Sequence, residues 1–164
     1  IRTMTKTIVI TGSTDGIGKL AALELASAGH EVIVHGRNRT KLQSTISEIK
    51  LKTGNEKIKG CIADLSDFQS IKQFSDELSD SLSKIDVLIN NAGVFKSPIA
   101  TNKDGFDIRL MVNYLAPYVL TKSVMNLLQK GNQPRLINLS SAAQSSVNLN
   151  ALKGNASLLS LIHI

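Results

Sequence analysis

The chain has 164 residues, of which 42% are hydrophobic and 20% are charged; this size and balance predict one globular domain and exclude a disordered chain. A single cysteine, Cys61, excludes an internal disulfide, and its place in an apolar run predicts a small buried side chain. The net charge of +6 comes from dispersed basic residues and only 4% of the residues are aromatic, so nucleic-acid binding is not expected.

No apolar run approaches the roughly 18 residues needed to cross a bilayer, and residues 1–10 lack the uninterrupted apolar stretch of a signal peptide. We therefore expect a cytoplasmic protein without a transmembrane segment, and peripheral association with a membrane stays open. The sequence predicts no metal site.

Five short, almost continuously apolar runs rich in β-branched residues predict strands that are buried on both faces. They lie at residues 7–11, 31–36, 57–65, 86–93 and 135–141. Amphipathic helices are predicted between them, one after the candidate N-cap Asp67 and another after Thr40, and Gly29 and Gly54 stand where helices should end. This alternation predicts right-handed crossovers and a parallel, doubly wound sheet, which binds ligands beyond the carboxyl ends of its strands.

The segment TGSTDGIG, residues 11–18, follows the first predicted strand and opens the next helix. Gly12 could turn the chain, Gly16 could let the backbone approach a ligand, and Gly18 could let the helix pack closely on the sheet. A helix that begins near Ile17 would present unpaired N–H groups and its positive dipole end to a pyrophosphate. A glycine loop alone can be an ordinary turn, but the strand–turn–helix context favours nucleotide binding.

The end of the second strand bears on which dinucleotide is bound. Sites selective for NAD usually place an acidic residue there, whereas this chain has Gly36 followed by Arg37. The guanidinium group of Arg37 could pair with a 2′-phosphate through two hydrogen bonds, so the sequence favours NADP(H) over NAD(H). The alternative is that Arg37 is an exposed loop residue without a ligand.

Polar residues also follow the third and fourth strands. Asp64 could hold an adenine amino group, and Asn90 or Asn91 could pin neighbouring backbone beneath a ribose, although each could also be a turn residue or a cap. In the helix after the fourth strand, Pro117 has no N–H to donate. A kink there should leave the main-chain carbonyl of Asn113 free to hold water, unless the helix simply bends around the proline.

Together these motifs resemble the short-chain dehydrogenase/reductase family. The segments in the family's order and spacing are TGSTDGIG, Asp64-Leu65, NNAG at 90–93, VNYLAPY around Asn113 and LINLSSAA at 136–143. The similarity covers residues 5–145, and the segments SSAAQ and VNLNAL are similar to the retinol-dehydrogenase-like branch. The resemblance implies a Rossmann-type α/β fold, a three-layer αβα sandwich with the strand order 3-2-1-4-5.

The resemblance also implies site residues and a reaction. Including the loop residues beside each motif, the predicted cofactor-binding residues are Gly12, Ser13, Thr14, Asp15, Gly16, Ile17, Gly18, Arg37, Asn38, Asp64, Leu65, Asn91, Ala92 and Gly93. Asn113 would be the structural-catalytic asparagine, Ser141 would bind the substrate oxygen, and Ser140 would shape the loop. The implied chemistry is hydride transfer between NADP(H) and a small-molecule alcohol or carbonyl substrate.

The chain departs from the family after Ser141, where the next helix should carry a Tyr that donates a proton and a Lys four residues later that lowers the pKa of this Tyr. The two tyrosines, Tyr114 and Tyr118, precede Ser141, so no Y-x-x-x-K follows it, and the family's later strands are missing as well. We interpret residues 1–145 as an incomplete NADP(H)-binding Rossmann domain, truncated before this motif, and residues 146–164 as an irregular tail.

Three hypotheses follow. The favoured one is a segment of an NADP-dependent oxidoreductase, inactive as it stands. The second is a catalytically silent NADP(H)-binding module. The third is an interaction protein that docks a partner or a second copy through the exposed edge of its fifth strand and its tail. A Y-x-x-x-K in the coding sequence beyond Ile164 would support the first hypothesis, and a stop codon would leave the other two.

Overall fold

The structure is a computed structural model that describes residues 4–140 of the chain. Its centre is a five-stranded sheet with the strand order β3-β2-β1-β4-β5, in which every pairing is parallel. The strands are β1 (Thr7–Ile10), β2 (Glu31–Gly36), β3 (Ile58–Ile62), β4 (Val87–Asn90) and β5 (Arg135–Asn138). The predicted Rossmann-type α/β fold and its strand order are therefore confirmed.

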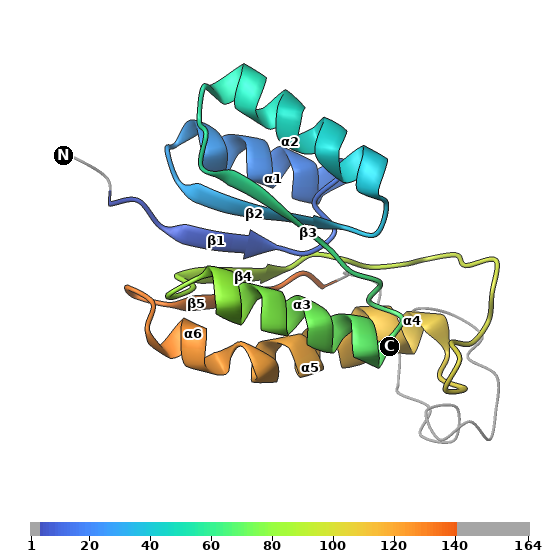
Figure 1. Cartoon of the computed structure of the whole chain (residues 1–164). Helices are drawn as coiled ribbons and strands as arrows, with labels where there is room; N and C mark the ends of the chain where they lie inside the picture. The colour runs from blue at the N-terminus through green and yellow to red at the C-terminus, as the bar shows by residue number, and fades with distance from the viewer. Residues whose placement is uncertain (1–3, 141–164) are drawn as a thin grey trace.

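Helices cover both faces of the sheet and complete the three-layer sandwich (Figure 1). One face carries α1 (Gly16–Ser27) and α2 (Arg39–Thr53), and the other carries α3 (Phe68–Ser81), α5 (Ala116–Ser123) and α6 (Met125–Gln129). A short helix α4 (Ile108–Leu110) and a π-helical turn η1 (Met111–Leu115) lead into α5. The strand order reverses between β1 and β4, and a crevice for a ligand is expected at their carboxyl ends.

Three strands end earlier than the sequence predicts. The strands β3, β4 and β5 end at Ile62, Asn90 and Asn138, about three residues before the predicted boundaries. At the end of β3 the chain leaves the sheet because the N–H of Asp64 donates to the Ser70 hydroxyl at 2.8 Å rather than to a neighbouring strand. Residues predicted as strand ends therefore form the loops around the crevice.

Side-chain caps determine where two helices begin. Asp67 caps α3 as predicted, because its carboxylate accepts a backbone N–H of the first turn at 2.9 Å. The helix α2 begins before Thr40, whereas the sequence predicts a helix that starts after this residue. The side-chain oxygen of Asn38 accepts the N–H of Lys41 at 2.9 Å, and the helix starts at Arg39.

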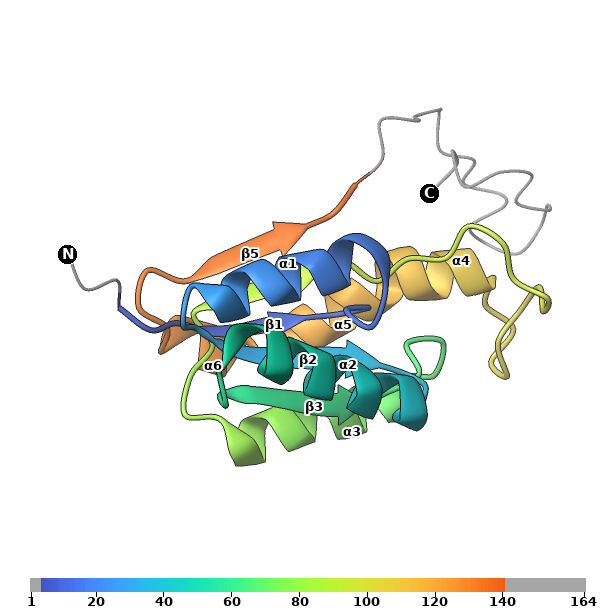
Figure 2. The same cartoon turned by 90° about the horizontal axis from the view of Figure 1, so that it is seen from above.

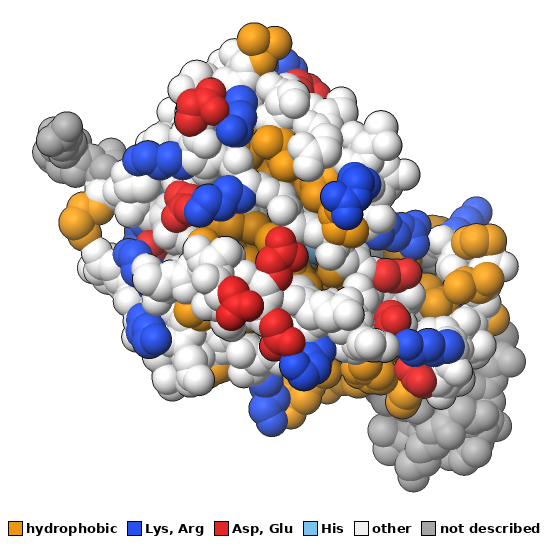
Figure 3. Space-filling model, in the orientation of Figure 1, with side chains coloured by type: hydrophobic (Ala, Val, Ile, Leu, Met, Phe, Trp, Pro, Cys, Tyr) orange, Lys and Arg blue, Asp and Glu red, His pale blue; other side chains and the backbone are white. Residues whose placement is uncertain are grey.

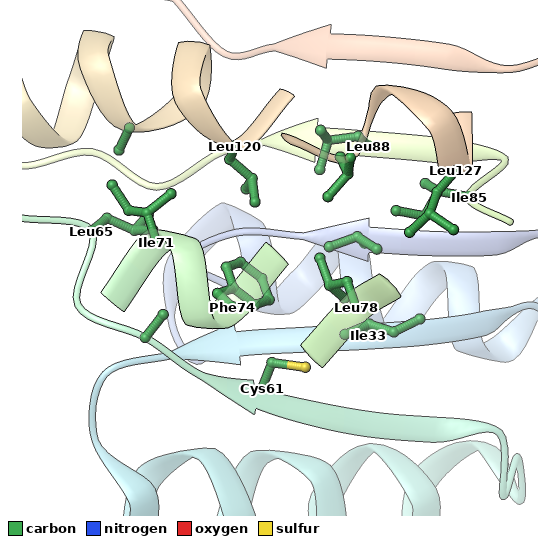
Figure 4. Packing of buried hydrophobic residues seen from close by; sticks show 14 of the residues in the cluster. Ile33, Cys61, Leu65, Ile71, Phe74, Leu78, Ile85, Leu88, Leu120 and Leu127 are labelled. Carbon is green, nitrogen blue, oxygen red and sulfur yellow. The ribbon is translucent and has the colours of Figure 1, made fainter. Parts of the chain in front are cut away.

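Two hydrophobic clusters fill the space between the layers. The larger lies between the sheet and α3, α5 and α6, where Phe74, Leu78 and Leu120 are fully buried (Figure 4). Cys61 belongs to this cluster, and burial raises the pKa of its thiol to about 12, so it is the small buried side chain that the sequence predicts. The second cluster packs α1 and α2 on the opposite face of the sheet.

The helical segment around Pro117 is irregular, as the proline predicts. Pro117 lies in the first turn of α5, directly after the π-helical turn, in which the N–H of Ala116 donates to the carbonyl of Met111 five residues earlier. This wider turn carries the helix past a residue that has no N–H of its own. That the Asn113 carbonyl holds water there remains a prediction.

Within the described residues, β5 forms an exposed edge of the sheet. All four residues of β5 are exposed, and this strand lies at the outer margin of the sheet (Figure 2). On the face seen in Figure 3, charged side chains of both signs are interspersed. Within residues 4–140, no helix is long and apolar enough to cross a membrane, and no group of three His, Cys, Asp or Glu residues could hold a metal ion.

Candidate functional site

A cavity of about 760 Å³ opens at the carboxyl ends of β1, β2, β3 and β4. Most of the predicted cofactor-binding residues line it. They are Gly12, Thr14, Asp15, Gly16, Ile17, Arg37, Asp64, Leu65, Asn91, Ala92 and Gly93. This volume is within the range of ligand sites, and the cavity lies where a doubly wound sheet binds ligands.

Three of the predicted cofactor-binding residues do not line this cavity. The buried Ser13 hydroxyl donates to the Ile10 carbonyl at 2.7 Å and accepts the main-chain N–H of His35 at 2.9 Å. A side chain at Gly18 would collide with Asn91, so this glycine lets α1 pack against the end of β4. The third, Asn38, caps α2. These residues shape the site rather than face it.

Besides Gly18, the glycine-rich loop has two more positions that favour glycine. Gly12 has a φ of 62°, and a Cβ atom there would stand 2.7 Å from the Cα of Ala92. Gly16 has a φ of 52°, and a Cβ atom there would meet no atom within 4 Å. Gly12 therefore allows two loops to touch, and Gly16 leaves the wall of the cavity open to a ligand at the N-terminus of α1.

A hydrogen-bond network locks the loop after β1 to the loop after β4. The side-chain amide of Asn91 donates to the carbonyls of Thr11 and Gly12 at 3.0 and 2.8 Å. The Thr11 hydroxyl in turn accepts the N–H groups of Asn91 and Ala92 at 3.1 and 3.0 Å. Asn91 thus pins neighbouring backbone, as the sequence suggests, whereas the role of Thr11 was not predicted.

His35 also holds this loop in place, and the sequence analysis did not predict this role. Its Nδ1 accepts the N–H of Gly12 at 3.0 Å, so the proton lies on Nε2, which faces the carbonyl of Ala63 at 3.2 Å. The ring stacks on Phe74 at a centroid distance of 4.9 Å. Burial lowers the pKa of His35 to about 4 and keeps the ring neutral. A His within an apolar strand was the signal, because a buried imidazole must find partners.

The end of β2 has no room for a side chain at Gly36, and the next residue is the cation Arg37. A Cβ atom at Gly36 would stand 2.6 Å from the Cγ2 of Thr14, so an acidic residue does not fit there without a rearrangement of the loop. Arg37 follows, exposed at the rim of the cavity, and it makes no hydrogen bond or ion pair with the part of the chain that the structure describes.

Asp64 shapes the turn after β3, and its contact with an adenine amino group stays a prediction. It lines the cavity, and one of its carboxylate oxygens accepts the N–H and the hydroxyl of Ser66 at 2.9 and 2.7 Å. The turn after β3 thus uses one oxygen of the carboxylate and leaves the other oxygen outside this turn.

The side chain of Asn113 holds the loop after β4 in place. Its amide forms two hydrogen bonds with the main chain of Val94, at 2.8 and 3.1 Å. Asn113 lines a second cavity of about 500 Å³, which shares Ala92 and Leu139 with the first and reaches Ser140. Ser141, the predicted substrate-binding residue, lies outside the described residues.

Comparison with known proteins agrees with this geometry. A family model described as short chain dehydrogenase matches residues 6–153. The chain belongs to the short-chain dehydrogenase/reductase family. Within this family it is similar to human retinol dehydrogenase 13, with 37% identity over 138 residues, which make up 84% of this chain and 42% of that protein.

Two further members of the short-chain dehydrogenase/reductase family extend the comparison. Human polyprenol dehydrogenase is 36% identical over 146 residues, which make up 87% of this chain and 44% of that protein. A short chain dehydrogenase structure from Escherichia coli CFT073, complexed with NADPH, is 29% identical, with a TM-score of 0.70 over 80% of this chain and 56% of that one. The chain thus spans less than half the length of these curated relatives.

Proposed function

We propose that this chain binds NADP(H) as the cofactor half of an oxidoreductase that transfers a hydride between the nicotinamide ring and an alcohol or carbonyl substrate. The observation that carries the proposal is the cavity at the carboxyl ends of the strands, which brings the glycine-rich loop, Arg37 and the segment 91–93 together. In this view residues 1–145 are the cofactor-binding unit, and Ser141 contacts the substrate.

The preference for NADP(H) rests on the end of β2. Gly36 packs against Thr14 and leaves no room for the acidic residue that NAD-selective sites use. Arg37 supplies a guanidinium group at the cavity rim with no competing partner among the described residues. A planar guanidinium group can bind a phosphate through two parallel hydrogen bonds, so it suits a 2′-phosphate. The NADPH-bound Escherichia coli structure supports this choice.

When bound, the nicotinamide would donate or accept the hydride. The backbone of the loop from Gly12 to Gly18 would receive the pyrophosphate at the N-terminus of α1. The network between Asn91 and Thr11 would hold this loop in place. Asn113 would keep the opposite wall in position through its two bonds to Val94.

The substrate class is an alcohol or carbonyl compound. The names of the related retinol and polyprenol dehydrogenases support an alcohol. The 164 residues hold no Y-x-x-x-K after Ser141, so the chain by itself would bind the cofactor without supplying the family's proton donor. A second candidate is a catalytically silent NADP(H)-binding module, in which the exposed edge of β5 could pair with a second copy.

The proposal is tested by titrating the purified protein with NADPH and with NADH, followed by cofactor fluorescence, with circular dichroism as a check of folding. Saturable binding that favours NADPH is the expected result. A folded protein that binds neither cofactor would overturn the proposal. Turnover of an alcohol with NADP by this chain alone would rule out the silent module, and sedimentation would detect a dimer.

A further inference from the structure

An ion pair links the wall of the cavity to α2, the helix that follows Arg37 in the chain. The carboxylate of Asp15 lies 2.6 Å from the ammonium group of Lys41. Asp15 belongs to the glycine-rich loop, lines the cavity and caps α1 by accepting the N–H of Gly16 at 2.8 Å. Lys41 comes from the first turn of α2, so the pair joins the loop after β1 to the helix after β2. The ammonium group of Lys41 is thus in contact with an atom of the cavity wall.

A second, polar hollow of about 550 Å³ adjoins the rim on the side of α2. It shares Thr14 with the main cavity, and Asn38 and Lys41 are among its lining residues. The other lysine that lines it, Lys19, is held by Glu48 at 2.6 Å. Of these two lysines, Lys41 is the one whose partner, Asp15, lines the main cavity.

Lys41 can exchange Asp15 for another anionic partner with little loss of protein stability. The side chains of Lys41 and Asp15 are 50% and 80% exposed, and ion pairs at such sites contribute little to stability. Hydrogen bonds from Lys41 and from the N–H of Gly16 lower the pKa of Asp15, so this carboxylate is charged at neutral pH. Without a ligand it neutralises Lys41, and it would repel a phosphate placed beside Arg37.

A phosphate monoester carries a charge of roughly −1.5 to −2 at neutral pH and is bound best by more than one cation. We propose that Lys41 is a specificity-determining residue that binds the cofactor's 2′-phosphate together with Arg37, and that Asp15 competes with this phosphate for Lys41. The inference rests on the proposed NADP(H) binding and adds to it. NADH lacks the 2′-phosphate, so it leaves the Asp15–Lys41 pair intact.

The test compares the affinities of NADPH and NADH in matched variants. Lys41→Gln should weaken NADPH about tenfold, the effect of losing one hydrogen bond to a charged group, and leave NADH within about twofold. Lys72→Gln is the control, because Lys72 pairs with Asp76 on α3 at 2.6 Å and neither residue lines the cavity or the hollow. Lys41→Arg should keep the preference for NADPH.

Asp15→Asn tests the competition separately. An asparagine still caps the helix, so the loop should keep its shape. The affinity ratio of NADPH to NADH should rise about threefold or more, in line with the removal of a weak competing ion pair. This gain should disappear in the Asp15→Asn, Lys41→Gln double variant if it acts through Lys41.

The outcomes separate this inference from the proposed function. Equal losses for the two cofactors in Lys41→Gln, or no loss at all, would overturn the role of Lys41 while cofactor binding by the wild type still stands. An unchanged ratio in Asp15→Asn would overturn the competition. A folded wild-type protein that binds neither cofactor would overturn both proposals.

Discussion

Acidification should destabilise the protein through His35 before it affects the carboxylates. The imidazole is 3% exposed, and burial lowers its pKa from 6.5 to about 4. Below pH 6.5 the unfolded chain binds a proton that the folded chain excludes, so the free energy of unfolding falls as the pH drops and levels off near pH 4. The gap between these two pKa values corresponds to about 3 kcal/mol. Above pH 6.5, His35 adds no pH dependence to the free energy of unfolding.

The carboxylates act in a different pH window. The buried Asp86 accepts hydrogen bonds from Lys84, from the N–H of Thr7 and from the N–H of Asn132. Burial alone would raise the pKa of Asp86, but these bonds bring it below 3.8. Its contribution is present above pH 3.8 and is lost only as the pH falls further. Most of the loss between pH 6.5 and 4 is therefore expected from His35, and Glu48, whose pKa is lowered from 4.5 to about 2 by its lysine partners, adds to it only below about pH 4.5.

The assay is urea unfolding at a series of pH values from 7 to 4, followed by circular dichroism. The wild type should lose about 3 kcal/mol over this range, close to the limit set by one His. His35→Gln keeps a side-chain acceptor for the N–H of Gly12 but cannot be protonated, so its stability should change much less. His30→Gln is the control, because His30 is only partly buried and its Nδ1 accepts the N–H of Lys6. If His35→Gln loses stability as steeply as the wild type, the reasoning is wrong.

Three substitutions test the cavity. Gly16→Val should abolish cofactor binding, because a β-branched residue at a φ of 52° is strained and its side chain would occupy the open wall; unchanged affinity in a titration would refute the assignment of the loop. Arg37→Ala should weaken NADPH at least about tenfold and NADH little, and equal losses would argue against a 2′-phosphate contact. Asn91→Ala leaves the carbonyls of Thr11 and Gly12 without its amide donor and should cost about 2 kcal/mol in urea unfolding. A stability equal to that of the wild type would mean that solvent replaces both bonds.

The sequence alone predicted the fold and most of the cavity wall. The apolar runs located the five strands and the strand–helix alternation predicted a parallel sheet, because a strand buried on both faces must be apolar throughout. The strand order came with the family resemblance. The glycine-rich loop and the cap at Asp67 were equally readable, since each depends on the conformation of a few adjacent residues. The strand ends were placed less well, because apolar character continues into the loops at Ala63 and Ala92.

The tertiary structure decided which side chains meet. His35 and Gly12 are 23 positions apart, Lys41 and Asp15 are 26 apart, and Asn91 and Gly12 are 79 apart. No local periodicity encodes such pairs, because each contact exists only after the strands have taken their order and the helices have packed on the sheet. The sequence thus predicted that a glycine-rich loop follows β1. The tertiary structure alone showed that a buried neutral imidazole holds this loop and that an ion pair joins the loop to α2.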